Sequence, residues 1–182
     1  MVSRVIISKN GNNNKQSNRM SLGTKQNKTF LNIREGKIIK KGPHGEEAYT
    51  YVEGYLGAIY TREREFKGER VPYWYIDLQE PSGGEIYSLS IPYSSGVAKS
   101  ILNALASAEE MGMVKIEVYQ RGEFTKATVY NKGQRLPWKY PQLPPLEEIQ
   151  VGGRTVKDDT RRMEFIEQIA REVTDKINFN LI

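Results

Sequence analysis

The stretch YTYVEGYLGAIYTR, residues 49–62, decides the fold together with the two apolar runs that follow it. It is rich in β-branched and aromatic residues, and Gly54 and Gly57 interrupt it where a strand can bulge or bend. Residues 71–78 (VPYWYIDL) and 85–91 (EIYSLSI) have the same β-rich composition and are separated by a Pro-Ser-Gly-Gly turn. This region therefore predicts three consecutive β-strands.

A helix and two further strands follow in the sequence. Apolar residues recur at helical spacing within residues 94–108, and Ser94 or Ser95 can cap this helix. Residues 113–119 (MVKIEVY) and 124–130 (FTKATVY) return to a period of two around a four-residue connection. Three strands, a helix and two strands is the chain order of the OB-fold, a five-stranded Greek-key barrel. We therefore predict a mainly β protein, with a five-stranded OB-fold barrel and a helix between strands three and four.

The N-terminal segment differs from this core in charge. Residues 1–45 hold ten Lys and Arg against Glu35 alone, whereas residues 46–182 hold 17 against 21 acidic residues. Residues 1–28 are expected to form a flexible basic arm, because they contain too little apolar surface to offset the entropy of ordering. Such an arm is typical of a protein that binds a polyanion and also of a solubilising tail.

Three further segments complete the expected organisation. Residues 29–133 are expected to form the barrel, with an extra N-terminal strand or hairpin around Gly36. Residues 134–157 contain four prolines within RLPWKYPQLPP and predict an extended strap. Residues 158–182 predict a C-terminal amphipathic helix, whose apolar stripe is Met163, Ile166, Ala170, Val173 and Ile177. We expect this stripe to pack on the barrel; the alternative is a coiled-coil or partner helix.

Composition excludes much enzyme chemistry. The chain has no Cys and a single His44, which leaves no thiolate nucleophile and no His pair for a metal. The sequence contains no phosphate-binding or dinucleotide-binding glycine motif. We therefore expect no enzyme activity, no metal and no cofactor. No apolar run approaches the roughly 18 residues of a membrane span, and the N-terminus lacks a signal-peptide core, so a cytoplasmic protein without membrane contact is expected.

Alternation along the strands assigns their two faces. Trp74 is expected inside the barrel, whereas Tyr73 and Tyr75 point outward. The residues of the first strand expected on the inner face are Val52, Leu56 and Ala58. An outer face of aromatic and basic residues suits a single nucleic-acid strand, since rings stack on bases and cations hold phosphates. The residues expected in this interface are Tyr49, Tyr51, Tyr55, Arg62, Arg64, Phe66, Lys67, Tyr73, Tyr75, Lys115, Tyr119, Arg121 and Lys126.

Two structural alternatives stand beside this interpretation. Tyrosine is a good strand former, so about half of the outward aromatic residues are expected to be structural, covered by the strap or the C-terminal helix. The loop of residues 61–70 (TREREFKGER) alternates acidic and basic residues around Phe66. It is either a finger that clamps a strand or a salt-bridged, solvated β-ribbon.

Residues 49–138 resemble single-stranded-DNA-binding proteins of the OB-fold type, particularly the divergent ones encoded by phages and mobile elements. The similar parts are YVEGYLGAIY, PYWYIDL, YSLSIPYSSGVAKSILNAL and KATVYNKGQRLPW. This resemblance implies binding, protection and handing-on of single strands during DNA replication or recombination. Bacterial members usually end in an acidic tail that recruits partners, whereas this chain ends in KINFNLI. The C-terminal helix is expected instead to mediate homo-oligomerisation or contact with a replication protein.

Two hypotheses follow for the function. The first is a non-enzymatic protein that binds single-stranded DNA without strong sequence specificity; RNA stays open as a ligand, since stacking surfaces serve both. The second is an assembly or adaptor protein in which the barrel is a scaffold and the C-terminal helix makes protein contacts. Steeply salt-dependent binding of nucleic acid would favour the first hypothesis.

Overall fold

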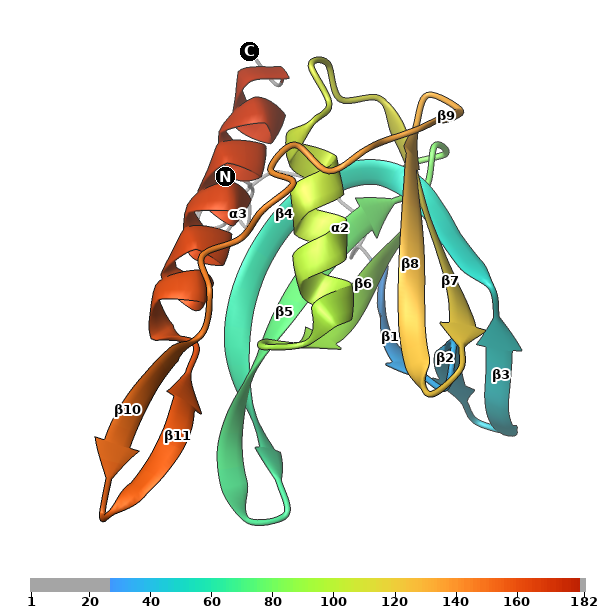
Figure 1. Ribbon diagram of the computed structural model, residues 1–182. Helices are drawn as coiled ribbons and strands as arrows, with labels where there is room; N and C mark the ends of the chain where they lie inside the picture. The colour runs from blue at the N-terminus through green and yellow to red at the C-terminus, as the bar shows by residue number, and fades with distance from the viewer. Residues whose placement is uncertain (1–26, 181–182) are drawn as a thin grey trace, which may run out of the picture.

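The computed structural model describes residues 27–180, with the side chains of residues 27–177. Its strands are β1 (Asn27–Arg34), β2 (Lys37–Gly42), β3 (Gly45–Tyr49), β4 (Tyr51–Phe66), β5 (Glu69–Gln79), β6 (Glu85–Pro92), β7 (Met113–Arg121), β8 (Phe124–Asn131), β9 (Gln134–Arg135), β10 (Glu147–Val151) and β11 (Arg154–Asp158). Its helices are α2 (Gly96–Ala106) and α3 (Thr160–Asn180). The mainly β class, the helix between β6 and β7 and the C-terminal helix are confirmed (Figure 1). Neither helix is apolar enough along its length to cross a membrane.

Nine of these strands form one sheet, in the order β3-β2-β1-β6-β5-β4-β7-β8-β9. Within it, β4, β5 and β6 are consecutive neighbours and β7 returns beside β4, which is a Greek-key connection. The expected barrel of five strands differs from the observed sheet, which has nine strands and is open over the described residues. The cause is β1, which pairs in parallel with β6 and so occupies the edge that a five-stranded barrel needs for closure.

The hairpin expected around Gly36 is present as β1 and β2. Its turn reaches the end of the β7–β8 hairpin, where the Gly36 N–H donates to Thr125 Oγ1 over 3.1 Å. Gly36 has a φ of 74°, and a Cβ at this position would lie 2.7 Å from the Gln120 backbone nitrogen. The sheet therefore curls until its two halves touch here, and only glycine fits at this contact.

The long strand β4 contains a β-bulge that shifts its faces. The register against β5 shifts between Leu56 and Ala58, so Gly57 is the extra residue. Ala58 pairs with Asp77 on the side turned away from the helices, and the inward assignment of Ala58 was therefore wrong. Beyond the bulge, Tyr60 points outward and Ile59 packs against the core.

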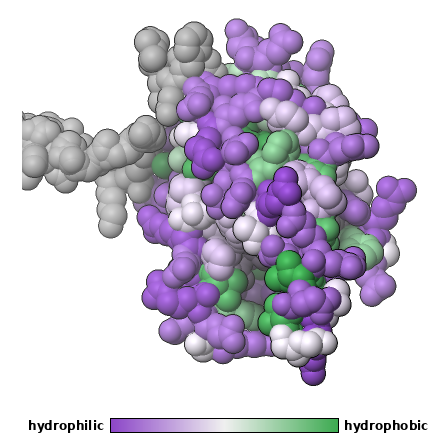
Figure 2. Space-filling model, turned by 60° about the vertical axis from the view of Figure 1, so that its left-hand side comes forward, coloured by the Kyte–Doolittle hydropathy of each residue, from purple (hydrophilic) through white to green (hydrophobic). Residues whose placement is uncertain are grey.

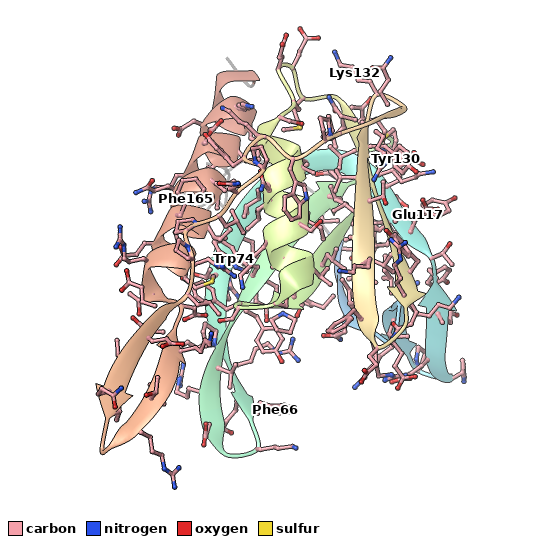
Figure 3. The ribbon with its side chains drawn as sticks, viewed as in Figure 1. Phe66, Trp74, Glu117, Tyr130, Lys132 and Phe165 are labelled. Atoms are coloured by element: carbon pink, nitrogen blue, oxygen red, sulfur yellow. The ribbon has the colours of Figure 1, made fainter. Side chains whose placement is uncertain are left out.

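The helices cover the inner face of the sheet and close the core. Helix α2 begins after Ser95, whose side chain accepts from the Ala98 N–H over 3.2 Å, which confirms one of the two expected caps. The expected stripe of α3 is buried from Met163 to Ile177, with Ile166 and Val173 fully inaccessible. This confirms packing on the body of the protein. Trp74 and Phe165 in Figure 3 mark the sheet and α3 sides of this layer.

Polar contacts also attach α3 and the strap to α2. Lys176 Nζ donates to the carbonyl oxygens of Ala106 and Ala108 over 2.5 and 2.6 Å, at the end of α2 where carbonyls lack helical partners. Tyr140 in the strap exchanges backbone hydrogen bonds of 2.7 and 2.9 Å with the side chain of the buried Asn103. The C-terminal helix is therefore an integral part of the fold.

The C-terminal half of the expected strap has regular structure. Residues 147–158 form the β10–β11 hairpin, which projects beside the β4–β5 ribbon at the lower edge of Figure 1. Its turn uses Gly152 and Gly153, with φ of 57° and 78°. The glycine pair between alternating apolar residues was a hairpin signal.

At the N-terminal end of the described residues, β1 begins at Asn27, so Lys28 of the expected arm lies in the sheet. Residues 1–26 of that arm lie outside the described residues.

Candidate nucleic-acid interface

The outer face of the sheet is the one turned away from α2 and α3. Where β1, β6, β5 and β4 lie side by side, this face gathers aromatic and basic side chains. We call this group the outer-face cluster, and its members are Lys28, Phe30, Tyr60, Arg62, Arg64, Tyr73 and Tyr75. Four of them, Arg62, Arg64, Tyr73 and Tyr75, were expected from the sequence, and the register of β4 against β5 brings them together.

Tyr75 lies at the centre of the cluster and is buried. Its ring stacks on Tyr60 with centroids 5.4 Å apart and meets Phe30 edge-on at 6.1 Å. Only 7% of Tyr75 is exposed, so this ring offers little surface for a base to stack on. Phe30, which is 50% exposed, is the ring that a base can reach instead.

Lys28 links the cluster to the buried Asp77. Its Nζ lies 3.0 Å from both the Tyr60 hydroxyl and an Asp77 carboxylate oxygen. Burial lowers the pKa of the Lys28 ammonium, but the hydrogen bonds to Tyr60 and Asp77 and the charge of Asp77 outweigh burial and raise it. Lys28 therefore stays charged, and its charge neutralises the Asp77 carboxylate.

Arg62 and Arg64 carry the free positive charge of the cluster. The Arg64 guanidinium lies 4.1 Å from the centroid of the Tyr73 ring, and that of Arg62 lies 5.3 Å from the Tyr60 ring. Arg64 also donates to Ser90 Oγ over 2.6 Å. Within residues 27–177, no carboxylate lies within 4.0 Å of either guanidinium. Arg62 is thus held by a ring and Arg64 by a ring and a hydroxyl, and both charges remain available to an anion.

A second group lies further round the outer face, on β4, β7 and β8. Lys115 Nζ lies between two rings, 5.1 Å from the centroid of Tyr51 and 4.9 Å from that of Tyr130. The Tyr130 hydroxyl donates to Glu117 over 3.3 Å, and Figure 3 shows these two side chains together. Tyr51 and Lys115 were expected here, whereas Tyr130 was not among the candidates. The nearby carboxylate makes this group less attractive to phosphate than the outer-face cluster.

The other candidates lie at the periphery. Tyr119 is opposite Lys126, and Arg121 is opposite Phe124, at the turn end of the β7–β8 hairpin. Phe66 and Lys67 form the tip of the β4–β5 ribbon, which projects from the body of the molecule where Figure 3 labels Phe66. Glu63 and Arg70 form an ion pair of 2.8 Å along this ribbon, as the salt-bridged alternative predicts.

Tyr49 and Tyr55 are exposed but lie outside the outer-face cluster. Tyr49 is the last residue of β3 and pairs with Ile38. The expected long strand is interrupted by a bend at Thr50, so Tyr49 is not part of β4. It was therefore wrongly assigned to the long strand. Tyr55, which is 49% exposed, lies in β4 between the two groups of the outer face.

Three members of the cluster were missed in the sequence. Lys28 was assigned to the arm, Phe30 to a separate hairpin, and Tyr60 was left out because the bulge was not placed. Parallel pairing of β1 with β6 brings Lys28 and Phe30 onto the face, and that pairing joins segments 58 residues apart. The apolar residues of FLNI predicted a strand or hairpin, but nothing in the sequence indicated which strand it would pair with.

Figure 2 shows one side of the molecule on which hydrophilic residues predominate and hydrophobic residues form only small patches. Among residues 27–177, no group of three or more His, Asp or Glu side chains is arranged to hold a metal ion. Comparison of the chain with protein-family models, with curated proteins and with solved structures gives no match.

Proposed function

We propose that this protein binds single-stranded DNA without strong sequence specificity, on the outer-face cluster. The observation that carries the proposal is the pair Arg62 and Arg64, held over tyrosine rings with no carboxylate within 4.0 Å in the described residues. Phosphates would replace solvent and counterions at these guanidinium groups. The exposed ring of Phe30 lies on β1 of the same face, across β5 and β6 from the two arginines, for a base to stack on.

The same chemistry favours a single strand over a duplex. A ring can stack on a base only if the base is unpaired and turned outward, whereas a duplex offers mainly phosphates. Rings accept every base, so weak sequence preference is expected. We further propose that β4 to β8 with α2 form an OB-fold unit. The Greek-key order of β7-β4-β5-β6 supports this, as does the resemblance of residues 49–138 to phage-type single-strand-binding proteins.

Such a protein would protect exposed strands during replication or recombination. The adaptor hypothesis has lost part of its basis, because the apolar stripe of α3 that was to contact partners is buried in the core. Removing residues 158–182 would therefore unfold the protein and cannot test that hypothesis.

The test is a fluorescence-anisotropy titration of a labelled dT strand of about 30 nucleotides and of a duplex of the same length, each at two salt concentrations. The proposal expects tighter binding of the single strand, weakened by salt. Equal and weak binding of strand and duplex would reject it, because unspecific attraction by the net charge of +5 would then suffice. A U-rich RNA strand of equal length, titrated alongside, shows whether RNA is also a ligand.

A further inference from the structure

A groove of about 820 Å³ lies on the helix side of the molecule, away from the outer-face cluster. Its walls are the N-terminal half of α2, residues 124–129 of β8, and the strap at residues 135–138. Figure 1 shows α2 and β8 running beside each other, with the strap crossing above them. Nothing in the proposed function uses this groove.

One wall of the groove is an exposed strand edge. β8 pairs with β7 along its length, but with β9 only at Tyr130 and Asn131. The Leu136 N–H adds one bond to the Val129 carbonyl over 2.8 Å, and Pro137, which has no N–H, then ends the ladder. In the described part of the chain, residues 124–128 thus have no second neighbouring strand. Their outward N–H and C=O groups can pair with a further extended segment.

The chain leaves β8 because it is attached to α2 instead. Trp138 Nε1 donates to Ser100 Oγ over 3.2 Å, and the next residue, Lys139, donates its backbone N–H to the Asn103 carbonyl. These bonds hold the strap away from the edge of β8 and keep the groove open.

The charge of the groove is strongly one-sided. Glu123 is the only acidic residue in its lining, whereas the basic lining residues are Lys99, Lys126, Arg135 and Arg162. Within residues 27–177, none of these four is in an ion pair. Burial lowers the pKa of Lys99, and the charge of Arg162 lowers it further, partly offset by Asp159. A ligand that carries carboxylates would relieve this repulsion.

The floor of the groove is apolar. Val97, Leu136 and Leu143 line it between helix and strand, and Trp138 at its rim is 46% exposed. In an added strand, side chains alternate between the two faces, so one set would meet this floor and the other the basic rim. A nucleic acid would use the cations but would leave the strand edge and the floor unpaired. The groove therefore fits a peptide better than a polynucleotide.

We propose that the groove docks an extended segment of a partner protein, rich in Asp and Glu with apolar residues at alternate positions, by strand addition to residues 124–128 of β8. The five free residues of the edge, at about 3.3 Å each, match a peptide strand of four to six residues. This proposal is independent of the outer-face cluster.

The probe is a random library of twelve-residue peptides displayed on phage and selected against the full chain. The proposal expects enrichment of acidic peptides with alternating apolar residues. A synthetic copy of the most enriched peptide is then titrated by intrinsic fluorescence. The chain has two tryptophans, of which Trp74 is 3% exposed, so a change in emission reports Trp138 in the groove.

The variants locate the binding. The double variant Lys99→Gln with Arg135→Gln should lower the affinity for the peptide about tenfold, because two charge contacts are lost. The control variant Arg154→Gln with Lys157→Gln removes the same amount of charge from β11, outside the groove, and should leave the affinity for the peptide unchanged. Affinity for the dT strand should stay the same in the groove variant, which separates this proposal from the proposed function. Three results would each overturn the proposal of a peptide groove. These are enrichment of peptides without acidic residues, equal affinity of the two double variants for the peptide, and a change in Trp138 emission on addition of the dT strand.

Discussion

Replacing Arg62 and Arg64 with glutamine should flatten the salt dependence of single-strand binding. Neither guanidinium has a carboxylate within 4.0 Å in residues 27–177, so each charge can neutralise one phosphate. For a single strand, each such contact contributes about 0.7 to the slope of log Kobs against log salt concentration, so the two together contribute about 1.4. Glutamine retains hydrogen-bonding capacity toward Ser90, so the fold should survive.

This slope converts into a change of affinity that can be measured. Between about 0.2 M and 0.05 M salt, the ratio of wild-type to variant affinity should rise about sevenfold, since four to the power 1.4 is about seven. The assay is anisotropy of a labelled dT strand of about 30 nucleotides over a salt series. Arg154→Gln with Lys157→Gln is the matched control, because it removes two positive charges from β11, outside the outer-face cluster.

The comparison of slopes decides the outcome. If the double variant and the β11 control have the same slope, net charge alone attracts the strand and the assignment of Arg62 and Arg64 to phosphates is refuted. A thermal unfolding curve of each variant excludes loss of folding as the cause.

Three further predictions concern the fold, each measured by urea unfolding. Ile166→Ala, at a fully buried position, should lower the free energy of unfolding by about 2–5 kcal/mol, against less than about 0.5 kcal/mol for exposed Gln168→Ala; equal effects would contradict the packing of α3. Gly122→Ala should lower the free energy of unfolding by about 1 kcal/mol, because Gly122 has a positive φ and open space around it. Gly36→Ala should lower it by about 1–3 kcal/mol more, because the added Cβ would also meet the backbone of Gln120. Equal losses for the two variants would rule out the contact between the two halves of the sheet. Burial raises the pKa of Glu172, but hydrogen bonds from the strap outweigh burial and lower the pKa below its ordinary value of 4.5. Glu172→Gln should therefore reduce the free energy of unfolding above pH 4.5, and this loss should shrink as the pH falls through the lowered pKa. A deficit that does not depend on pH would argue against the ion pair that Glu172 forms with Lys139 of the strap.

Local patterns predicted the elements of the core well. The period of two in residues 71–78 and the helical spacing in residues 94–108 correspond to β5 and α2, because burial of one face leaves a readable repeat. The stripe from Met163 to Ile177 likewise predicted the buried face of α3. These features depend on neighbours close in the sequence.

The features that were missed depend on contacts between distant segments or on a single residue. Gly57 and Gly54 are equally suited to a bulge in the sequence, and only pairing with β5 selects Gly57. Tyr75 is buried because β1, which is distant in the sequence, places the Phe30 ring against it. Because that parallel pairing leaves no local repeat, the sequence predicted which residue types form the face but not which of them stay accessible.

The position of the bound strand can be measured directly by photocrosslinking. A dT strand with 5-bromodeoxyuridine at successive positions is irradiated in complex with the full chain, and the modified residues are identified by mass spectrometry. We predict adducts on Phe30, Tyr60 and Tyr73, the accessible rings of the outer-face cluster. Adducts confined to Trp138 in the groove or to the β10–β11 hairpin would contradict binding on the outer face of the sheet.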